Sequence, residues 1–267
     1  MHNPGITAAL VVNFDIPPRK REEIERQGIS IHRIEFAAFR MPESLPWACA
    51  YFKLEALAFL AERYDHVTLI DCDTFTVGGY ADLQRESADR ILLYDLQHRL
   101  SHPDRQRIIQ NHLAIFGENT PLIHYGGELV AGPRNLLKPF AAQCQEVAAA
   151  IRERNHLLVH DMGDEQILSG AAHRMPQCIR CANSYIFRYW TTPRFRLLST
   201  NYQYNAVDIW HLPSEKESGL PALYRYLRRH GEFPKRPSCI RLFGLDRPNA
   251  GRIFDALRRL RNRCLSR

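Results

Sequence analysis

Short apolar runs alternate along this chain with segments of helical character, and this alternation limits its fold more than any other feature. Residues 8–14, 29–36 and 66–70 are strand-sized apolar or alternating runs. Between them, residues 19–27 are charged and residues 51–64 repeat apolar side chains at helical spacing. An order of strand, helix, strand, helix and strand predicts a parallel sheet with helices on both faces.

The second half of the body continues the same pattern. Residues 90–94 and 129–131 are further candidate strands, and residues 136–155 form a candidate helix rich in Ala and Glu. The predicted fold class is therefore α/β, with a mostly parallel mixed sheet flanked by helices. No apolar run approaches the ~18 residues that a membrane span requires, and the N-terminus lacks the pattern of a secretory signal. We expect a cytoplasmic chain.

Positive charge is concentrated at the C-terminal end. The chain has a net charge of +7, and residues 221–267 contribute thirteen Lys or Arg against Glu232, Asp246 and Asp255, or +10. The body is thus mildly acidic, at −3. We predict a catalytic or binding domain over residues 1–220 and a basic, helical appendage over 221–267, whose amphipathic run at 250–265 suits an anionic membrane surface or packing on its own domain.

Two carboxylates follow the third predicted strand, at Asp71 and Asp73. Residues two apart in extended chain point to the same side. Paired carboxylates are costly unless a cation, usually a hard metal ion bound through oxygen, neutralises them. Such an ion bridging a diphosphate fits this pattern. The alternative is that one Asp caps the following turn and the other is solvated.

In the surrounding sequence, residues 51–57, 67–75 and 79–83 resemble the central block of GT-A fold glycosyltransferases. The likeness is greatest to family 8, the galactosyl- and glucosyltransferases of bacterial lipo-oligosaccharide and of glycogenin-type acceptors. In that family a helix with a basic residue, here Lys53, precedes a D-x-D strand that binds Mn²⁺ and the nucleotide-sugar diphosphate.

Three later segments extend the resemblance. Residues 124–134 are similar to the family's F-N-x-G-V strand, with Gly126 in place of the usual Asn; residues 160–168 resemble D-Q-D-x-L-N and the H-D-E-S-x-L-N of family 6; residues 206–216 resemble H-x-x-G-x-x-K-P-W. The sequence departs from the family in three ways. Fewer residues than usual precede Asp71, the Gly and Pro-Trp after His211 are absent, and Lys216 lies one position closer.

The resemblance implies a metal-dependent transfer of a hexosyl group, with retention, from a UDP-sugar to the hydroxyl of a saccharide or glycolipid acceptor. The implied cofactor is Mn²⁺ or Mg²⁺. The implied site residues are, for the metal, Asp71, Asp73 and His211; for the donor, Lys53, Gly126, Gly127 and Lys216; and for catalysis, Asp164 and Glu165. From their place after the first strand, Asn13 and Asp15 are candidates to contact the base and ribose.

Four of these residues also suit an ordinary structural role. Lys53 suits the exposed side of an amphipathic helix, His211 suits a buried strand, and Asp164 and Glu165 suit the first turn of a helix.

Two other classes compete with this interpretation. Haloacid dehalogenase-type phosphatases also end a strand in D-x-D, with the first Asp as nucleophile, but the Gly-Thr that follows in their motif is Thr74-Phe75 here. A basic nucleic-acid-binding or membrane-binding protein would account for the positive charge. No nucleic-acid-binding motif stands in the body, so nucleic acid is the less favoured partner.

Overall fold

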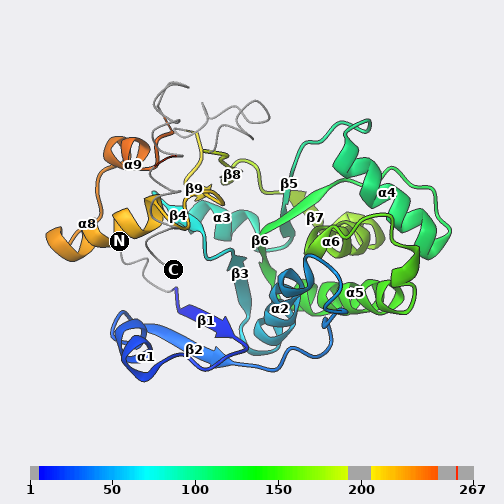
Figure 1. Ribbon diagram of the computed structural model, residues 1–267, viewed down its shortest axis with the longest axis horizontal. Helices are drawn as coiled ribbons and strands as arrows, with labels where there is room; N and C mark the ends of the chain where they lie inside the picture. The colour runs from blue at the N-terminus through cyan, green and yellow to red at the C-terminus, as the bar shows by residue number, and fades with distance from the viewer. Residues whose placement is uncertain (1–5, 192–205, 246–256, 258–267) are drawn as a thin grey trace. The chain divides into compact units, whose positions relative to one another are not determined.

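The computed structural model describes residues 6–191, 206–245 and Leu257. These residues divide into two compact units, drawn in Figure 1. Unit 1 comprises Met1–Leu69 and Tyr80–Cys181, and unit 2 comprises Ile70–Gly79 and Ala182–Arg267. Within each unit, the described residues are those given above. The chain therefore leaves unit 1 for a short excursion at residues 70–79 and returns to it.

Unit 1 is built on a sheet of four strands in the order β3-β6-β5-β7. Their bounds are β3, His66–Ile70; β5, Ile91–Asp95; β6, Tyr125–Pro133; and β7, Ile179–Cys181. β5 pairs with β6 in antiparallel and with β7 in parallel orientation, so the sheet is mixed. A register shift after Leu93 marks an irregularity in the β5–β6 ladder.

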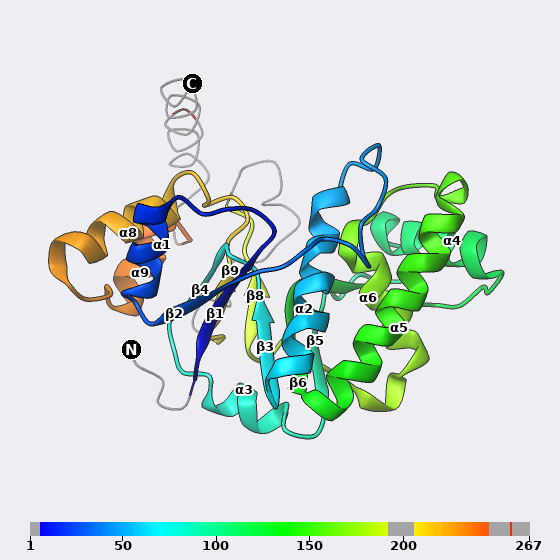
Figure 2. The same ribbon diagram turned by 90° about the horizontal axis from the view of Figure 1, so that it is seen from below.

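Helices cover this sheet and bury its apolar side chains. The bounds of the helices in unit 1 are α1, Pro18–Glu25; η1, Ala48–Tyr51; α2, Phe52–Arg63; α3, Ala81–Glu86; α4, Pro103–Phe116; α5, Arg134–Glu153; η2, Asn155–Leu157; α6, Gly163–Arg174; and η3, Pro176–Cys178. The views of Figures 1 and 2 show α2, α5 and α6 lying beside one another. The main core joins Leu57, Leu93, Val130, Phe140 and Leu168 from α2, the two central strands, α5 and α6.

The first two strands form a sheet of their own. β1, Ala8–Val12, pairs in parallel with β2, Ile29–Arg33, and Ala8 lies opposite Ile29. We expected all of the early strands in one sheet, because the order of elements indicates that strands are parallel but does not determine which strands exchange hydrogen bonds. The α/β class with mixed sheets flanked by helices is confirmed.

Unit 2 has a small three-stranded sheet in the order β4-β9-β8. Its elements are β4, Thr74–Thr76; β8, Ile186–Arg188; β9, Ile209–His211; α8, Gly219–His230; and α9, Arg236–Leu242. An aromatic core of Phe75, Trp210 and Phe243 binds these elements together, with ring centroids 5.4 to 6.3 Å apart.

Helices α8 and α9 belong to the predicted basic appendage, and they contribute Leu223 and Ile240 to the core of unit 2. The predicted amphipathic run at 250–265 lies outside the described residues apart from Leu257. The division at residue 220 therefore stays a prediction. None of the described helices combines the length with the hydropathy that crossing a membrane requires.

Two leucines on helices of unit 1 offer a matched test of where the core lies. Leu57 on α2 is fully buried, whereas Leu113 on α4 is 43% exposed. We expect Leu57→Ala to lower the free energy of unfolding by about 2–5 kcal/mol, because it leaves a cavity. Leu113→Ala should change it by less than about 1 kcal/mol. Urea unfolding followed by far-UV circular dichroism measures both values, and equal effects would contradict the assigned core.

Candidate functional site

The predicted metal ligands lie together in unit 2. Strand β3 ends at Ile70, and a tight turn carries Asp71 to β4. Thr74 closes this turn, because its backbone N–H and its Oγ1 both donate to the carbonyl oxygen of Asp71, at 3.1 and 2.7 Å. The turn fixes the backbone of both aspartates.

His211 reaches the aspartates through the pairing of β4 with β9. Thr74 lies opposite His211 in this antiparallel ladder, and the N–H of Leu212 donates to the carbonyl oxygen of Asp73 at 2.9 Å. The Nε2 atom of His211 lies 3.2 Å from Oδ1 of Asp73 and 3.6 Å from Oδ2 of Asp71. One ligand atom from each of the three side chains lies within 4.8 Å of the other two. The geometry suits a shared cation.

Lys216 adds a positive charge to the same cluster. Its Nζ lies 3.0 Å from Oδ2 of Asp73, which is only 4% exposed. The preceding residue, Glu215, is buried and accepts hydrogen bonds from Ser218 Oγ at 2.6 Å and from the N–H of Gly219 at 3.0 Å, which fixes the start of this segment. Burial alone would raise the pKa of Asp73, but hydrogen bonds and charges from His211 and Lys216 outweigh it and hold that pKa far below its usual range.

A second group of predicted site residues lies in unit 1. Lys53 on α2 places its Nζ 3.0 Å from Oδ2 of Asp164 in the first turn of α6. The side chains are 19% and 8% exposed, so the ion pair is largely buried. Gly127 on β6 leaves room for it, because a Cβ atom there would lie 1.8 Å from Oδ2 of Asp164 and 2.7 Å from Nζ of Lys53. The strand backbone therefore borders the ion pair directly.

Asp161 holds the two helices that carry this pair. Its carboxylate accepts hydrogen bonds from the N–H of Trp47 at 2.8 Å, from the hydroxyl of Tyr51 at 2.6 Å and from the N–H of Gly163 at 3.0 Å. Gln166 donates to the Tyr51 hydroxyl at 2.6 Å. Burial, together with the bond to Asp161, raises the pKa of Tyr51 far above its usual value. Sequence analysis missed this role of Asp161, although the residue stands in the 160–168 motif.

Glu165, the other predicted catalytic residue, contacts a histidine of unit 1. Its Oε2 lies 2.8 Å from Nε2 of the buried His124, and Nδ1 of His124 lies 3.0 Å from Nδ1 of His98. Burial first, and then the neighbouring rings of His124 and His102, lower the pKa of His98 to about 4. Sequence analysis did not predict these contacts, although His124 begins the 124–134 motif.

Asn13 and Asp15 follow β1 and are exposed. Asp15 forms an ion pair with Arg33 at 3.3 Å. Gly126 lies on β6 opposite Tyr94. Asn13 and Asp15 are thus placed at the end of a strand as expected, but their contact with a base and ribose stays a prediction.

Comparisons with known proteins add little to this geometry. No protein-family model matches the chain, and no curated protein matches it. Among solved structures, the chain is similar to mouse xyloside xylosyltransferase 1 in its apo form, with 11% sequence identity and a TM-score of 0.45 over 73% of this chain and 80% of that one. At this similarity we transfer no residue's role from that structure.

A double-mutant cycle tests the ion pair of unit 1. We expect Lys53→Met and Asp164→Asn to show a coupling energy of about 1–3 kcal/mol, because both charges are shielded from water. The exposed pair Lys20–Glu23 on α1, at 3.0 Å, is the control and should couple by less than about 0.5 kcal/mol. Denaturant unfolding gives both energies, and similar values for the two pairs would contradict the burial of Lys53–Asp164.

Proposed function

We propose that this chain is a metal-dependent glycosyltransferase that moves a hexosyl group from a UDP-sugar to a hydroxyl of a saccharide or glycolipid acceptor. The observation that carries the proposal is the cluster of Asp71, Asp73 and His211 with Lys216 beside it. A cluster of this kind suits a cation and an anionic ligand together. The resemblance of the surrounding motifs to family 8 supplies the reaction class.

The residues fit the metal that the resemblance implies. Two carboxylates and one imidazole are a donor set that Mn²⁺ accepts, and Mg²⁺ accepts the carboxylates. Both aspartates hold their oxygens near one imidazole nitrogen. When bound, a divalent cation acts as a Lewis acid that stabilises the negative charge of a departing diphosphate. Lys216, with a side chain 65% exposed, is placed to bind a phosphate oxygen without leaving this cluster.

The group in unit 1 suits recognition of a sugar. The carboxylate of Asp164 can accept hydrogen bonds from sugar hydroxyl groups, and its ion pair with Lys53 fixes its position. Gly127 exposes the backbone of β6 beside this pair, where any side chain would collide with it. Glu165 follows Asp164 and carries a carboxylate that can stabilise a positive anomeric carbon. We assign Asp164 and Glu165 to the sugar and Lys53 to the donor.

Several further features of the proposal are inferred from the sequence alone. These are retention of configuration, a lipo-oligosaccharide acceptor, a cytoplasmic location and association of residues 221–267 with an anionic membrane surface. Removal of residues 246–267 tests the last of them, since release from anionic vesicles with unchanged transfer to a soluble acceptor would support it.

Donor hydrolysis is the direct test. The purified chain is incubated with UDP-glucose, UDP-galactose, UDP-N-acetylglucosamine or GDP-mannose, with Mn²⁺ or with EDTA, and release of nucleoside diphosphate is measured. We expect release from one donor, dependent on metal, and a fall of at least about a hundredfold in Asp73→Ala, because one ligand and its charge are lost. Asp82→Ala, on the surface of α3 with a side chain 74% exposed, is the control and should retain activity.

Two results would overturn the proposal. One is the absence of release from every donor together with no stabilisation of the chain by UDP and Mn²⁺. The other is hydrolysis of a simple phosphate monoester that depends on Asp71 more than on His211, which would favour a phosphatase with Asp71 as nucleophile.

Gly127 provides a second test, aimed at unit 1. We expect Gly127→Ala to lower kcat/KM for the donor by about a hundredfold, because the new methyl group displaces Asp164 and Lys53 by an ångström or more. The thermal midpoint should fall no further than loss of the Lys53–Asp164 ion pair lowers it, since the displaced atoms are the ends of those two side chains. Gly170→Ala on α6, where a Cβ would meet Val147 at 3.4 Å and Nδ1 of His112 at 3.8 Å, is the matched control. Equal activity of the two variants would remove Gly127 from the site.

A further inference from the structure

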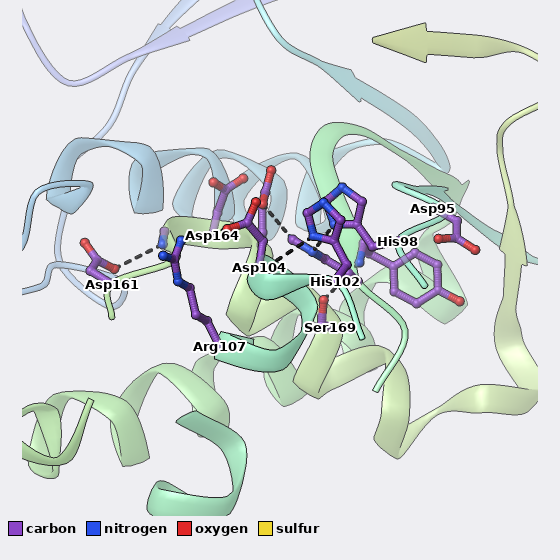
Figure 3. A network of polar contacts seen from close by, with 12 residues as sticks. Asp95, His98, His102, Asp104, Arg107, Asp161, Asp164 and Ser169 are labelled. Atoms are coloured by element: carbon purple, nitrogen blue, oxygen red, sulfur yellow. Dashed lines mark hydrogen bonds and ion pairs between the residues drawn. The ribbon is translucent and has the colours of Figure 1, made fainter. Parts of the chain in front are cut away.

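A second group of metal-binding side chains lies in unit 1, in the loop before α4 and in the first turn of that helix. One ligand atom from each of His98, His102 and Asp104 lies within 4.8 Å of the other two. The imidazole rings of His98 and His102 stack with centroids 3.6 Å and planes 12° apart, so one ring has to turn before both can direct a nitrogen lone pair at one ion. Figure 3 shows these three side chains gathered at the start of α4. None of them has a part in the proposed glycosyl transfer.

The backbone of this loop is fixed from several directions. Arg105 donates from Nη1 to the carbonyl oxygen of His98 at 2.8 Å and from Nε to that of Leu122 at 2.6 Å. Asp95 accepts the N–H of Gln97 at 2.7 Å. His102 is the N-cap of α4, where its Nδ1 accepts from the N–H of Asp104. The three side chains are therefore presented by an ordered backbone, which limits the conformational entropy that binding a metal would cost.

A chain of hydrogen bonds orients His98. The carboxylate of Glu165 contacts Nε2 of His124, and Nδ1 of His124 contacts Nδ1 of His98. When His124 donates its Nε2–H to Glu165, its Nδ1 accepts the Nδ1–H of His98. This tautomer directs the lone pair of His98 to Nε2. Histidines that bind metals commonly donate their other ring N–H to a carboxylate in this way, here through a second histidine.

We propose that His98, His102 and Asp104 form a second metal site, which binds a divalent transition ion of the Zn²⁺ class. Two imidazoles and one carboxylate favour Zn²⁺, Ni²⁺ or Co²⁺ over the oxygen-preferring Mg²⁺ and Mn²⁺. Three protein ligands leave at least one position for water. The ligands of this site differ from those in unit 2, and the site connects to the residues of the proposed glycosyl transfer through His124 and Glu165.

Two existing contacts of Asp104 bear on metal binding: one is replaced by the ion and the other is kept. The hydrogen bond from the N–H of Asp104 to His102 Nδ1 is long, at 3.3 Å, and an ion bound at that nitrogen replaces it. Arg107 contacts Oδ1 of Asp104 at 2.8 Å, which leaves the second carboxylate oxygen for the metal. Binding joins the loop to α4 and, through His98 and His124, restricts the orientation of Glu165.

The test is a titration of the full chain with Zn²⁺ in competition with a chromophoric chelator, together with the visible absorption spectrum of the Co²⁺-loaded chain. We expect His98→Gln and His102→Gln each to weaken Zn²⁺ binding by at least about a hundredfold and to remove the Co²⁺ bands. Glu165→Gln should weaken binding by about 10–100-fold, because it changes the orientation of His98 indirectly. His156→Gln, an exposed histidine on η2, is the matched control and should bind as the parent chain does.

A double variant, Asp71→Asn with Asp73→Asn, separates the two sites. It should lose Mn²⁺-dependent donor hydrolysis and keep the Co²⁺ bands. Thermal melting of each variant in EDTA reports folding without metal, and Asp104→Asn replaces any histidine variant that does not fold. Zn²⁺ binding that survives when His98→Gln and His102→Gln are combined with the Asp71 and Asp73 double variant, or that disappears only in that double variant, would overturn the proposal of a second site.

Discussion

The hydrogen bonds of the Asp161 carboxylate are the interaction on which the arrangement of unit 1 depends. This carboxylate receives the hydroxyl of Tyr51 and the N–H of Trp47, from segments more than a hundred positions earlier in the chain. Tyr51 is fully buried, and a buried hydroxyl without a hydrogen-bond partner is disfavoured, so the two segments must meet if the core is to close. Lys53 and Asp164 lie two and three residues from the members of this contact. Their ion pair beside Gly127 follows from it.

Unit 2 also places a buried carboxylate, that of Asp73, next to basic side chains. Asp73, at 4% exposed, is at least as inaccessible as Asp164, at 6%, and it lies beside an imidazole and an ammonium group. Both units thus use the same device, a buried carboxylate beside a flexible lysine. Beside Asp73, a second aspartate, Asp71, lies near the same imidazole nitrogen, which is an arrangement that suits a cation.

Local sequence was sufficient for the elements whose signals are local. The apolar run at 66–70 is β3 as predicted, and the helix predicted at 136–155 is α5, Arg134–Glu153. The three-residue strands β4, β8 and β9 are too short to show a period, and their pairing depends on aromatic packing between distant segments. The aspartates of the D-x-D motif were found by their spacing. The contacts of Glu165 with His124 and of Asp161 with Tyr51 arise only from tertiary structure, which no pattern along the chain records.

The pairing of β4 with β9 has a consequence for the order in which this protein is made. Asp71 and Asp73 leave the ribosome early, but the strand that carries His211 is synthesised only after all of unit 1. Non-local strand pairing of this kind forms late in folding. The complete set of Asp71, Asp73 and His211 therefore exists only once the polypeptide has been extended well past unit 1, and a nascent chain has two of the three candidate ligands for about half of its synthesis.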